Sequence, residues 1–249
     1  MKLNKKILAL LLTGLIFSTN SYANSPEIQS PAMNTEDPYE SFNRVMFDFN
    51  MGFNDTVGLP LANAYNGVVP QPVRTGLNNV FDNLQTPLSA INCFLQGKTE
   101  DGLSEIMRFT INSTFGLFGL LDIAEPAGLT AKEEDLGQTL YHRGVWNEAD
   151  YLVLPFIGRF TTRSLTGNAI DSTYDPVYNY ILDVENDERS LIFFGNAFVK
   201  YTSVVNLVED IKPQPDPYVF SRESYLQYRT NQIYDGKAPQ PSLDDFNFE

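Results

Sequence analysis

Apolar and polar residues recur with a helical period along most of the chain, most clearly from residue 37 to residue 57. Six apolar side chains there fall on one arc of a helix: Phe42, Val45, Met46, Phe49, Phe53 and Val57. Asn43, Asn50 and Asn54 form a separate stripe beside that arc, which is unusual for a surface helix. We expect this stripe either to line a polar passage or to form helix-to-helix hydrogen bonds.

The start of this helix is marked by local sequence signals. Asp37 is the predicted N-cap, Pro38 suits the first helical position, and Glu40 follows three residues after the cap. Arg44 and Asp48 are four residues apart, which predicts an ion pair along the helix.

Helical spacing continues after a predicted break at 58–60. It predicts a helix over 73–84, a stop at Thr86-Pro87, and a short helix over 88–95 that Gly97 ends. Thr99 is the predicted cap of a further helix, whose inner face is expected to carry Leu103, Ile106, Met107 and Ile111.

Two apolar segments do not follow the helical period. Residues 113–124 are nearly all apolar and are interrupted by two glycines, so they form either a buried connection or a re-entrant, interfacial segment. Residues 151–157 are the one strand-like run, and Pro155 makes them a poor central strand. Residues 136–141 are expected to be extended or looped.

Helical patterns return in the last third of the chain. A helix is predicted to begin at 161–170, and another over 191–208 has an apolar face covering nearly half its circumference. So wide a face suits either a protein core or a membrane interface, with Lys200 reaching toward head groups. A last helix is predicted over 218–234. The fold class is therefore all-α.

The N-terminal pattern is that of a secretory signal peptide. Lysines precede an apolar run, and small residues precede a cleavage site after Ala23. We expect a signal peptide over 1–23, a flexible leader over 24–36, one helical domain over 37–235, and a disordered acidic tail over 236–249.

Composition narrows the class of function. The chain has 17 basic and 31 acidic residues, a net charge of −14, and the predicted signal peptide removes three of the lysines. This acidity argues against nucleic acid and against electrostatic docking on anionic lipid. Membrane contact would then depend on apolar surface.

Motifs for catalysis and for metal or phosphate binding are absent from the sequence. Acidic runs such as 133–135 are expected to be solvated surface charge. The one cysteine, Cys93, is expected to be a buried small hydrophobe, and the one histidine, His142, is poorly placed as a base. We expect no enzyme activity, no cofactor and no metal.

Segments in order along the chain resemble the VacJ/MlaA family of Gram-negative outer-membrane proteins. They are DPYESFNRVMFDFN (37–50), VPQPVRTGLNN (69–79), FLQGK (94–98), RFTINSTFGLFGLLDIA (108–124), LGQTL (136–140), YLVLPFIG (151–158) and DPYVFSRESYLQYR (216–229). The chain departs from many family members in having no cysteine before Cys93, so it is expected to carry no lipid anchor.

The resemblance implies a ring- or disc-like helical protein in the inner leaflet of the outer membrane, on its periplasmic face. An amphipathic central channel would remove mislocalised phospholipid from the outer leaflet and pass it to a soluble periplasmic carrier. A trimeric porin is the implied partner in the membrane. It also implies that residues 151–157 form an ordered loop closing the fold.

Two sets of residues are candidates for contact with lipid. The candidates for the channel are Phe42, Asn43, Arg44, Phe47, Asn50 and Asn54. The candidates for contact with the membrane are Phe115, Leu117, Phe118, Leu120, Leu121, Phe194, Phe198 and Tyr201.

Two other hypotheses remain at this point. The same helices and acidic surface would suit an envelope scaffold that associates with a porin and transports nothing. A periplasmic hydrolase is the weaker hypothesis, and it requires activity to depend on His142 or Cys93.

Overall fold

The computed structural model describes residues 36–182 and 185–238. The predicted signal peptide, almost all of the leader, and positions 239–249 of the predicted tail lie outside these residues. The regular secondary structure of the described chain is helical apart from one small hairpin, which confirms the all-α prediction. Its helices are α2 (Glu40–Phe53), α3 (Leu59–Val68), α4 (Gln71–Gln96), α5 (Thr99–Thr114), α6 (Leu136–His142), α7 (Thr162–Tyr174), α8 (Asn186–Glu209) and α9 (Pro217–Ile233).

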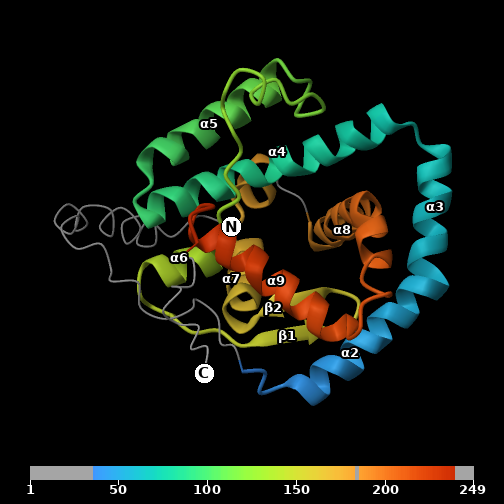
Figure 1. The fold of residues 1–249 in the computed structure, drawn as a ribbon. Helices are drawn as coiled ribbons and strands as arrows, with labels where there is room; N and C mark the ends of the chain where they lie inside the picture. The colour runs from blue at the N-terminus through green and yellow to red at the C-terminus, as the bar shows by residue number, and fades with distance from the viewer. Residues whose placement is uncertain (1–35, 183–184, 239–249) are drawn as a thin grey trace.

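Helices α2, α3 and α4 follow one another around one side of the molecule, and α8 lies inside the arc that they form (Figure 1). The predicted break at 58–60 is wrong, because a π-helical turn, η1 (Asn54–Gly58), joins α2 to α3. Its wider turn lets the Leu59 amide bond the Asn54 carbonyl, so the helical path continues.

Helix α2 begins later than the sequence signals predict. The N-cap position is Tyr39, and the helix begins at Glu40. The Asp37 carboxylate is engaged elsewhere: it accepts hydrogen bonds from the Asn43 amide and from the Tyr218 hydroxyl of α9. Long-range contacts therefore replace the predicted cap.

Helix α4 passes through Pro87, where a stop is predicted. Pro87 has no amide hydrogen to donate within the helix. The Thr86 hydroxyl bonds the carbonyl of Asp82 at 3.1 Å, and α4 packs along α5 throughout this region. Packing on both sides of the proline therefore outweighs the local cost. Gly97 ends α4 as predicted, with a φ of 87°.

Residues 151–157 belong to an antiparallel hairpin. Strand β1 (Tyr151–Leu154) pairs with β2 (Gly158–Thr161), with Tyr151 opposite Thr161 and Leu154 opposite Gly158. Pro155 lies in the turn, where no ladder hydrogen bond is needed. The second strand, GRFT, has no apolar alternation and is absent from the sequence prediction.

One further segment differs from its predicted extended or looped conformation. Residues 136–141 form α6, because the Asp135 carboxylate caps the amide of Gln138 at 2.8 Å. Residues 177–181 form a second π-helical turn, η2 (Val177–Ile181), and Asp175 caps its start through the amide of Val177.

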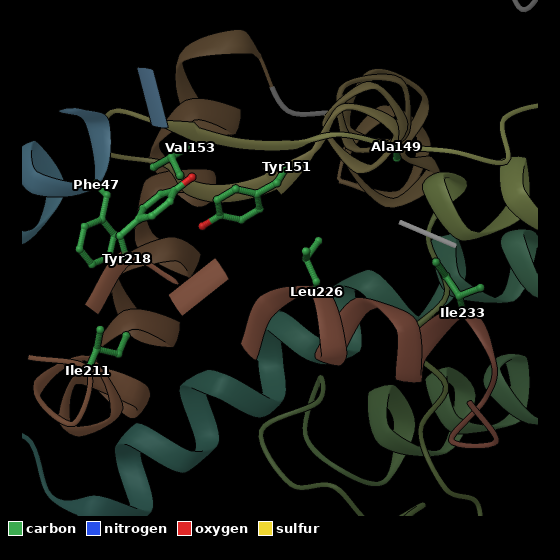
Figure 2. Packing of buried hydrophobic residues seen from close by; sticks show 8 residues of the cluster. All are labelled: Phe47, Ala149, Tyr151, Val153, Ile211, Tyr218, Leu226 and Ile233. Carbon is green, nitrogen blue, oxygen red and sulfur yellow. The ribbon is translucent and has the colours of Figure 1, made fainter. Parts of the chain in front are cut away.

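The apolar core lies between the hairpin, α2 and α9 (Figure 2). Its buried members are Phe47, Ala149, Tyr151, Val153, Ile211, Tyr218, Leu226 and Ile233. Phe47 and Tyr218 meet edge to face, with ring centres 5.8 Å apart. This core is small for a chain of this length, since many large apolar side chains are exposed.

Candidate functional site

The asparagine stripe of α2 faces the protein. Asn43 is fully buried, and its amide nitrogen donates to the Tyr151 carbonyl and to Asp37, both at 3.0 Å. Its amide oxygen accepts the amide hydrogen of Val153, with a nitrogen–oxygen distance of 2.8 Å. The buried hydrogen bonds of Asn43 therefore hold β1 against α2.

Asn50 and Asn54 continue this role farther along the helical path. Asn50 donates to the Leu154 carbonyl and accepts from the Phe156 amide, at 2.9 and 2.8 Å. Asn54 bridges η1 to α8 by accepting from the Tyr201 hydroxyl at 2.6 Å and donating to Glu209 at 3.2 Å. Asn54 thus forms the predicted hydrogen bonds between helical elements, whereas Asn43 and Asn50 bond the hairpin instead.

The other three predicted channel residues occupy different surroundings. The Arg44 guanidinium donates two hydrogen bonds to the Asp216 carboxylate, at 3.0 and 3.2 Å, and pairs with Glu40 at 2.7 Å. The predicted pairing with Asp48 is therefore wrong. The hydrogen bonds that Arg44 donates to the carboxylates of Asp216 and Glu40 raise the pKa of its guanidinium. Phe47 is in the core, whereas Phe42 is exposed.

A polar cavity of about 640 Å³ lies elsewhere in the fold. Its walls come from α4, α5, the 122–135 segment, β2, α7, α8 and α9. None of the six predicted channel residues is among the residues that line it. Their proposed contact with lipid stays a prediction.

Charge dominates the lining of this cavity. Nine carboxylate and six cationic side chains line it within the described part of the chain. Arg108 is the most connected of them: it is buried, lies 2.9 Å from Asp122 and 3.0 Å from Glu125, and has Glu105 at 3.8 Å. Burial raises the pKa of Glu105 to about 7, despite the hydrogen bond from the Lys132 amide.

The acidic run at 133–135 takes part in this lining. Its prediction as solvated surface charge is wrong for Glu134 and Asp135, whereas Glu133 is exposed. Glu134 is buried and pairs with Lys98 at 2.7 Å, and Asp135 pairs with Arg229 at 2.7 Å. Burial also raises the pKa of Asp171, to about 6. Sequence alone does not locate these groups, because their partners are distant along the chain.

The outer surface of the same helices is apolar. Apart from Met46, which packs against the core, the arc predicted on α2 is exposed, and so are large apolar side chains on α3, α4 and α5, including three that were expected on the inner face of α5. They are Phe42, Val45, Phe49, Phe53, Val57, Leu61, Val68, Val73, Ile91, Leu103, Ile106 and Met107. An apolar surface of this extent is typical of membrane or protein interfaces.

Six of the eight predicted membrane-contact residues are exposed: Phe115, Leu117, Phe118, Leu120, Leu121 and Phe194. The exposure of the 115–121 segment rules out the buried connection. Phe198 and Tyr201 are partly buried instead. Phe198 packs edge-on against Tyr65, with ring centres 5.4 Å apart, and Tyr201 bonds Asn54.

Helix α8 is long and apolar enough, over residues 187–209, to cross a membrane by length and composition. Only 17% of this stretch is buried within the protein. Lys200 lines the cavity and pairs with Asp82 of α4 at 3.1 Å. The helix thus combines polar contacts toward the cavity with a broad exposed apolar surface.

Within residues 36–182 and 185–238 no cluster of histidine, cysteine and carboxylate side chains is arranged to hold a metal ion. Cys93 is fully buried, as predicted, and burial raises the pKa of its thiol to about 12. A thiol with so high a pKa is protonated at neutral pH and is a poor nucleophile.

Comparison with known proteins gives a consistent result over most of the chain. A family model described as "MlaA lipoprotein" matches residues 35–232. The "intermembrane phospholipid transport system lipoprotein MlaA" of Escherichia coli (strain K12) is 32% identical over 231 residues, covering 88% of this chain and 86% of that protein. Its Haemophilus influenzae counterpart is 32% identical over 238 residues, covering 94% and 92%.

A solved structure gives the same picture at the level of the fold. The work behind it is described as "Structural basis for maintenance of bacterial outer membrane lipid asymmetry". It matches this chain with a TM-score of 0.70 and 31% identity, covering 81% of this chain and all of the other.

Proposed function

The chain belongs to the MlaA family, and on this premise we propose that it is the outer-membrane component of a phospholipid transport system. It would remove mislocalised phospholipid from the outer leaflet and release it toward a soluble periplasmic carrier. It would work by positioning and solvating the lipid, without a cofactor and without breaking a bond.

The observation that carries this proposal is the inverted orientation of α2. Its asparagines bond the interior of the protein, while its apolar arc, including Val45 with 60% of its side chain exposed, faces outward. A helix of a water-soluble protein turns its apolar face inward. The reverse arrangement suits a surrounding of lipid tails, in which exposed leucine and phenylalanine cost nothing.

The cavity gives the interior a matching property. Moving a phospholipid head group through hydrocarbon is costly, because its charges lose their hydration. A lining of carboxylate, guanidinium, amide and hydroxyl groups offers hydrogen-bond partners along the way. In this proposal the helices form a ring or disc in the inner leaflet, with the polar cavity as part of its channel.

The exposed residues of the 115–121 segment and Phe194 are proposed to lie against lipid. Their apolar side chains would hold the protein at the periplasmic side of the outer membrane without requiring a covalent lipid anchor. A trimeric porin and a soluble lipid carrier are the proposed protein partners.

The test is to measure phospholipid exposed in the outer leaflet of intact cells with a membrane-impermeant head-group label. Deleting the gene should raise the label, and the full chain should restore it. Asn196→Trp places an indole against the cavity and should fail to restore it. Leu207→Trp is the matched control, because Leu207 lies on the same helix, is 63% exposed and is not part of the cavity lining.

Two results would contradict the proposal. An unchanged label on deletion would favour a porin-associated scaffold that transports nothing. Full restoration by both tryptophan variants would show that the cavity is not on the transport route, provided that each variant reaches wild-type abundance in the membrane.

A further inference from the structure

Arg159 on β2 is a cation that lines the cavity without an acidic partner. Its guanidinium donates to the hydroxyl and carbonyl oxygens of Ser221, at 3.0 and 3.3 Å, and lies 5.9 Å from the centre of the Tyr225 ring. Among the described residues no carboxylate forms an ion pair with it. Its side chain is exposed to the cavity, so the charge is available to a ligand.

Glu133 is an anion of the cavity lining without a basic partner among the described residues. It lines the same cavity and is exposed, and its carboxylate accepts a long hydrogen bond, 3.4 Å, from the Tyr228 hydroxyl. No lysine or arginine in the described part of the chain pairs with it. Its neighbours differ, since Glu134 is paired with Lys98 and Asp135 with Arg229.

These two charged side chains both contact helix α9. Arg159 contacts α9 at Ser221 and Tyr225, and Glu133 contacts it at Tyr228. Ser221 and Tyr228, which form the hydrogen bonds, are seven positions apart, which corresponds to a rise of about 10.5 Å. The cavity therefore presents a positive and a negative group about two helical turns apart along the α9 wall.

A ligand that lies between these two groups, with a negative group toward Arg159 and a positive group toward Glu133, matches this arrangement. In an ethanolamine phospholipid, a phosphate diester and an ammonium group are joined by two carbons. A glycerol head group has the same phosphate but no cation. The cavity as a whole carries more carboxylates than cations, which disfavours a ligand with a net negative charge.

We propose that the cavity selects phospholipids with a zwitterionic ethanolamine head group over anionic ones with a glycerol head group. Arg159 binds the phosphate, and Glu133 binds the ammonium. This inference rests on the proposed function, because it assumes that phospholipid enters the cavity.

The test is a competition between two lipids. Full-length protein in mild detergent is incubated with equimolar phosphatidylethanolamine and phosphatidylglycerol with identical tails, repurified, and its bound lipids are counted by mass spectrometry. We expect the wild type to enrich the ethanolamine lipid about three- to tenfold, the range for one charge-assisted contact at a partly exposed site. Glu133→Gln should bring the ratio close to that of the mixture while total bound lipid is kept.

Two further variants make the test specific. Arg159→Gln should lower binding of both lipids by the same factor, because both carry the phosphate. Glu148→Gln is the matched control: it makes the same change of charge at an exposed position outside the cavity and should leave ratio and amount unchanged. Circular dichroism confirms that each variant is folded.

The outcomes separate this inference from the proposed function. No bound phospholipid at all in the wild type would count against the proposed function itself. Bound lipid in the proportions of the mixture, or a ratio that Glu133→Gln leaves unchanged, would overturn only the selectivity. Binding of water-soluble glycerophosphoethanolamine with no binding of the intact lipid would overturn the assignment to a lipid head group.

Discussion

Replacing Asn43 by alanine tests whether the asparagine stripe is part of the structural framework. The substitution removes the side chain that satisfies the Tyr151 carbonyl and the Val153 amide of β1. Asn43 is fully buried, so water cannot readily replace it. Each backbone group left unsatisfied costs about 1–3 kcal/mol, which gives about 2–6 kcal/mol for the pair.

This loss should be visible in thermal unfolding. For a domain of this size, 1 kcal/mol corresponds to roughly 2–4 °C, so the unfolding temperature should fall by roughly 5–20 °C. The measurement is a melt followed by circular dichroism in one detergent, at matched protein concentration. Asn50→Ala is the matched control, since Asn50 makes the same two kinds of bond to the same hairpin but is only partly buried.

We expect Asn50→Ala to lower the unfolding temperature by less than half as much as Asn43→Ala. An Asn43→Ala protein as stable as the wild type would refute the reasoning, because the bonds to β1 would then contribute nothing. Equal losses for the two variants would show that burial does not set the cost. Normal stability combined with lost transport would favour a direct channel role for Asn43.

Three other predictions concern the surface, the buried charges and the helix crossings. Val45→Lys should reduce flotation with liposomes while the unfolding temperature in detergent is kept, because a lysine in hydrocarbon costs about 3 kcal/mol; undiminished flotation would place this surface outside lipid. Burial holds the pKa of Glu105 in the folded state at about 7, above the ordinary 4.5. The protonated carboxyl therefore stabilises the fold fully below pH 4.5, and this contribution is lost as pH rises through 7. Glu105→Gln should therefore remove a decline of at most about 3 kcal/mol over that interval, measured by urea unfolding at each pH, and a slope identical to that of the wild type would refute this assignment. Gly167→Ala would place a Cβ 2.4 Å from the Gly137 backbone and should destabilise the α6–α7 crossing by about 1–3 kcal/mol, whereas Gly52→Ala, with open space around it, should be neutral or stabilising in the same melts.

Helical periodicity located most of the helices but not the orientation of their faces. On α2 the pattern separates an apolar arc from an asparagine stripe, and it cannot say which one meets protein. In the proposed membrane setting the apolar arc faces outward because hydrocarbon would solvate Phe49 as well as a core would. Leu103 on α5 is a second case: its helical spacing predicts a position on the inner face, but the residue is 53% exposed.

Elements that depend on partners far along the chain were the ones missed. Strand β2 has no alternation of its own and exists because β1 and α7 flank it. Arg159 and Glu133 are ordinary surface charges in the sequence, and only the folded chain brings both into one cavity. A useful local signal was present in Asp135, three residues before Gln138, which is a capping pattern for α6.

Contacts of α2 and the residues before it with the start of α9 join the two ends of the described chain. Tyr218 bonds Asp37, 181 positions away, and Arg44 bonds Asp216, 172 positions away. Contacts of such high sequence separation form late, because they carry the full entropy of loop closure. Until residue 218 is available, Phe47 and Tyr151 therefore lack the α9 side chains that cover them in the core. Truncation before α9 should leave an aggregating chain rather than a shorter functional one.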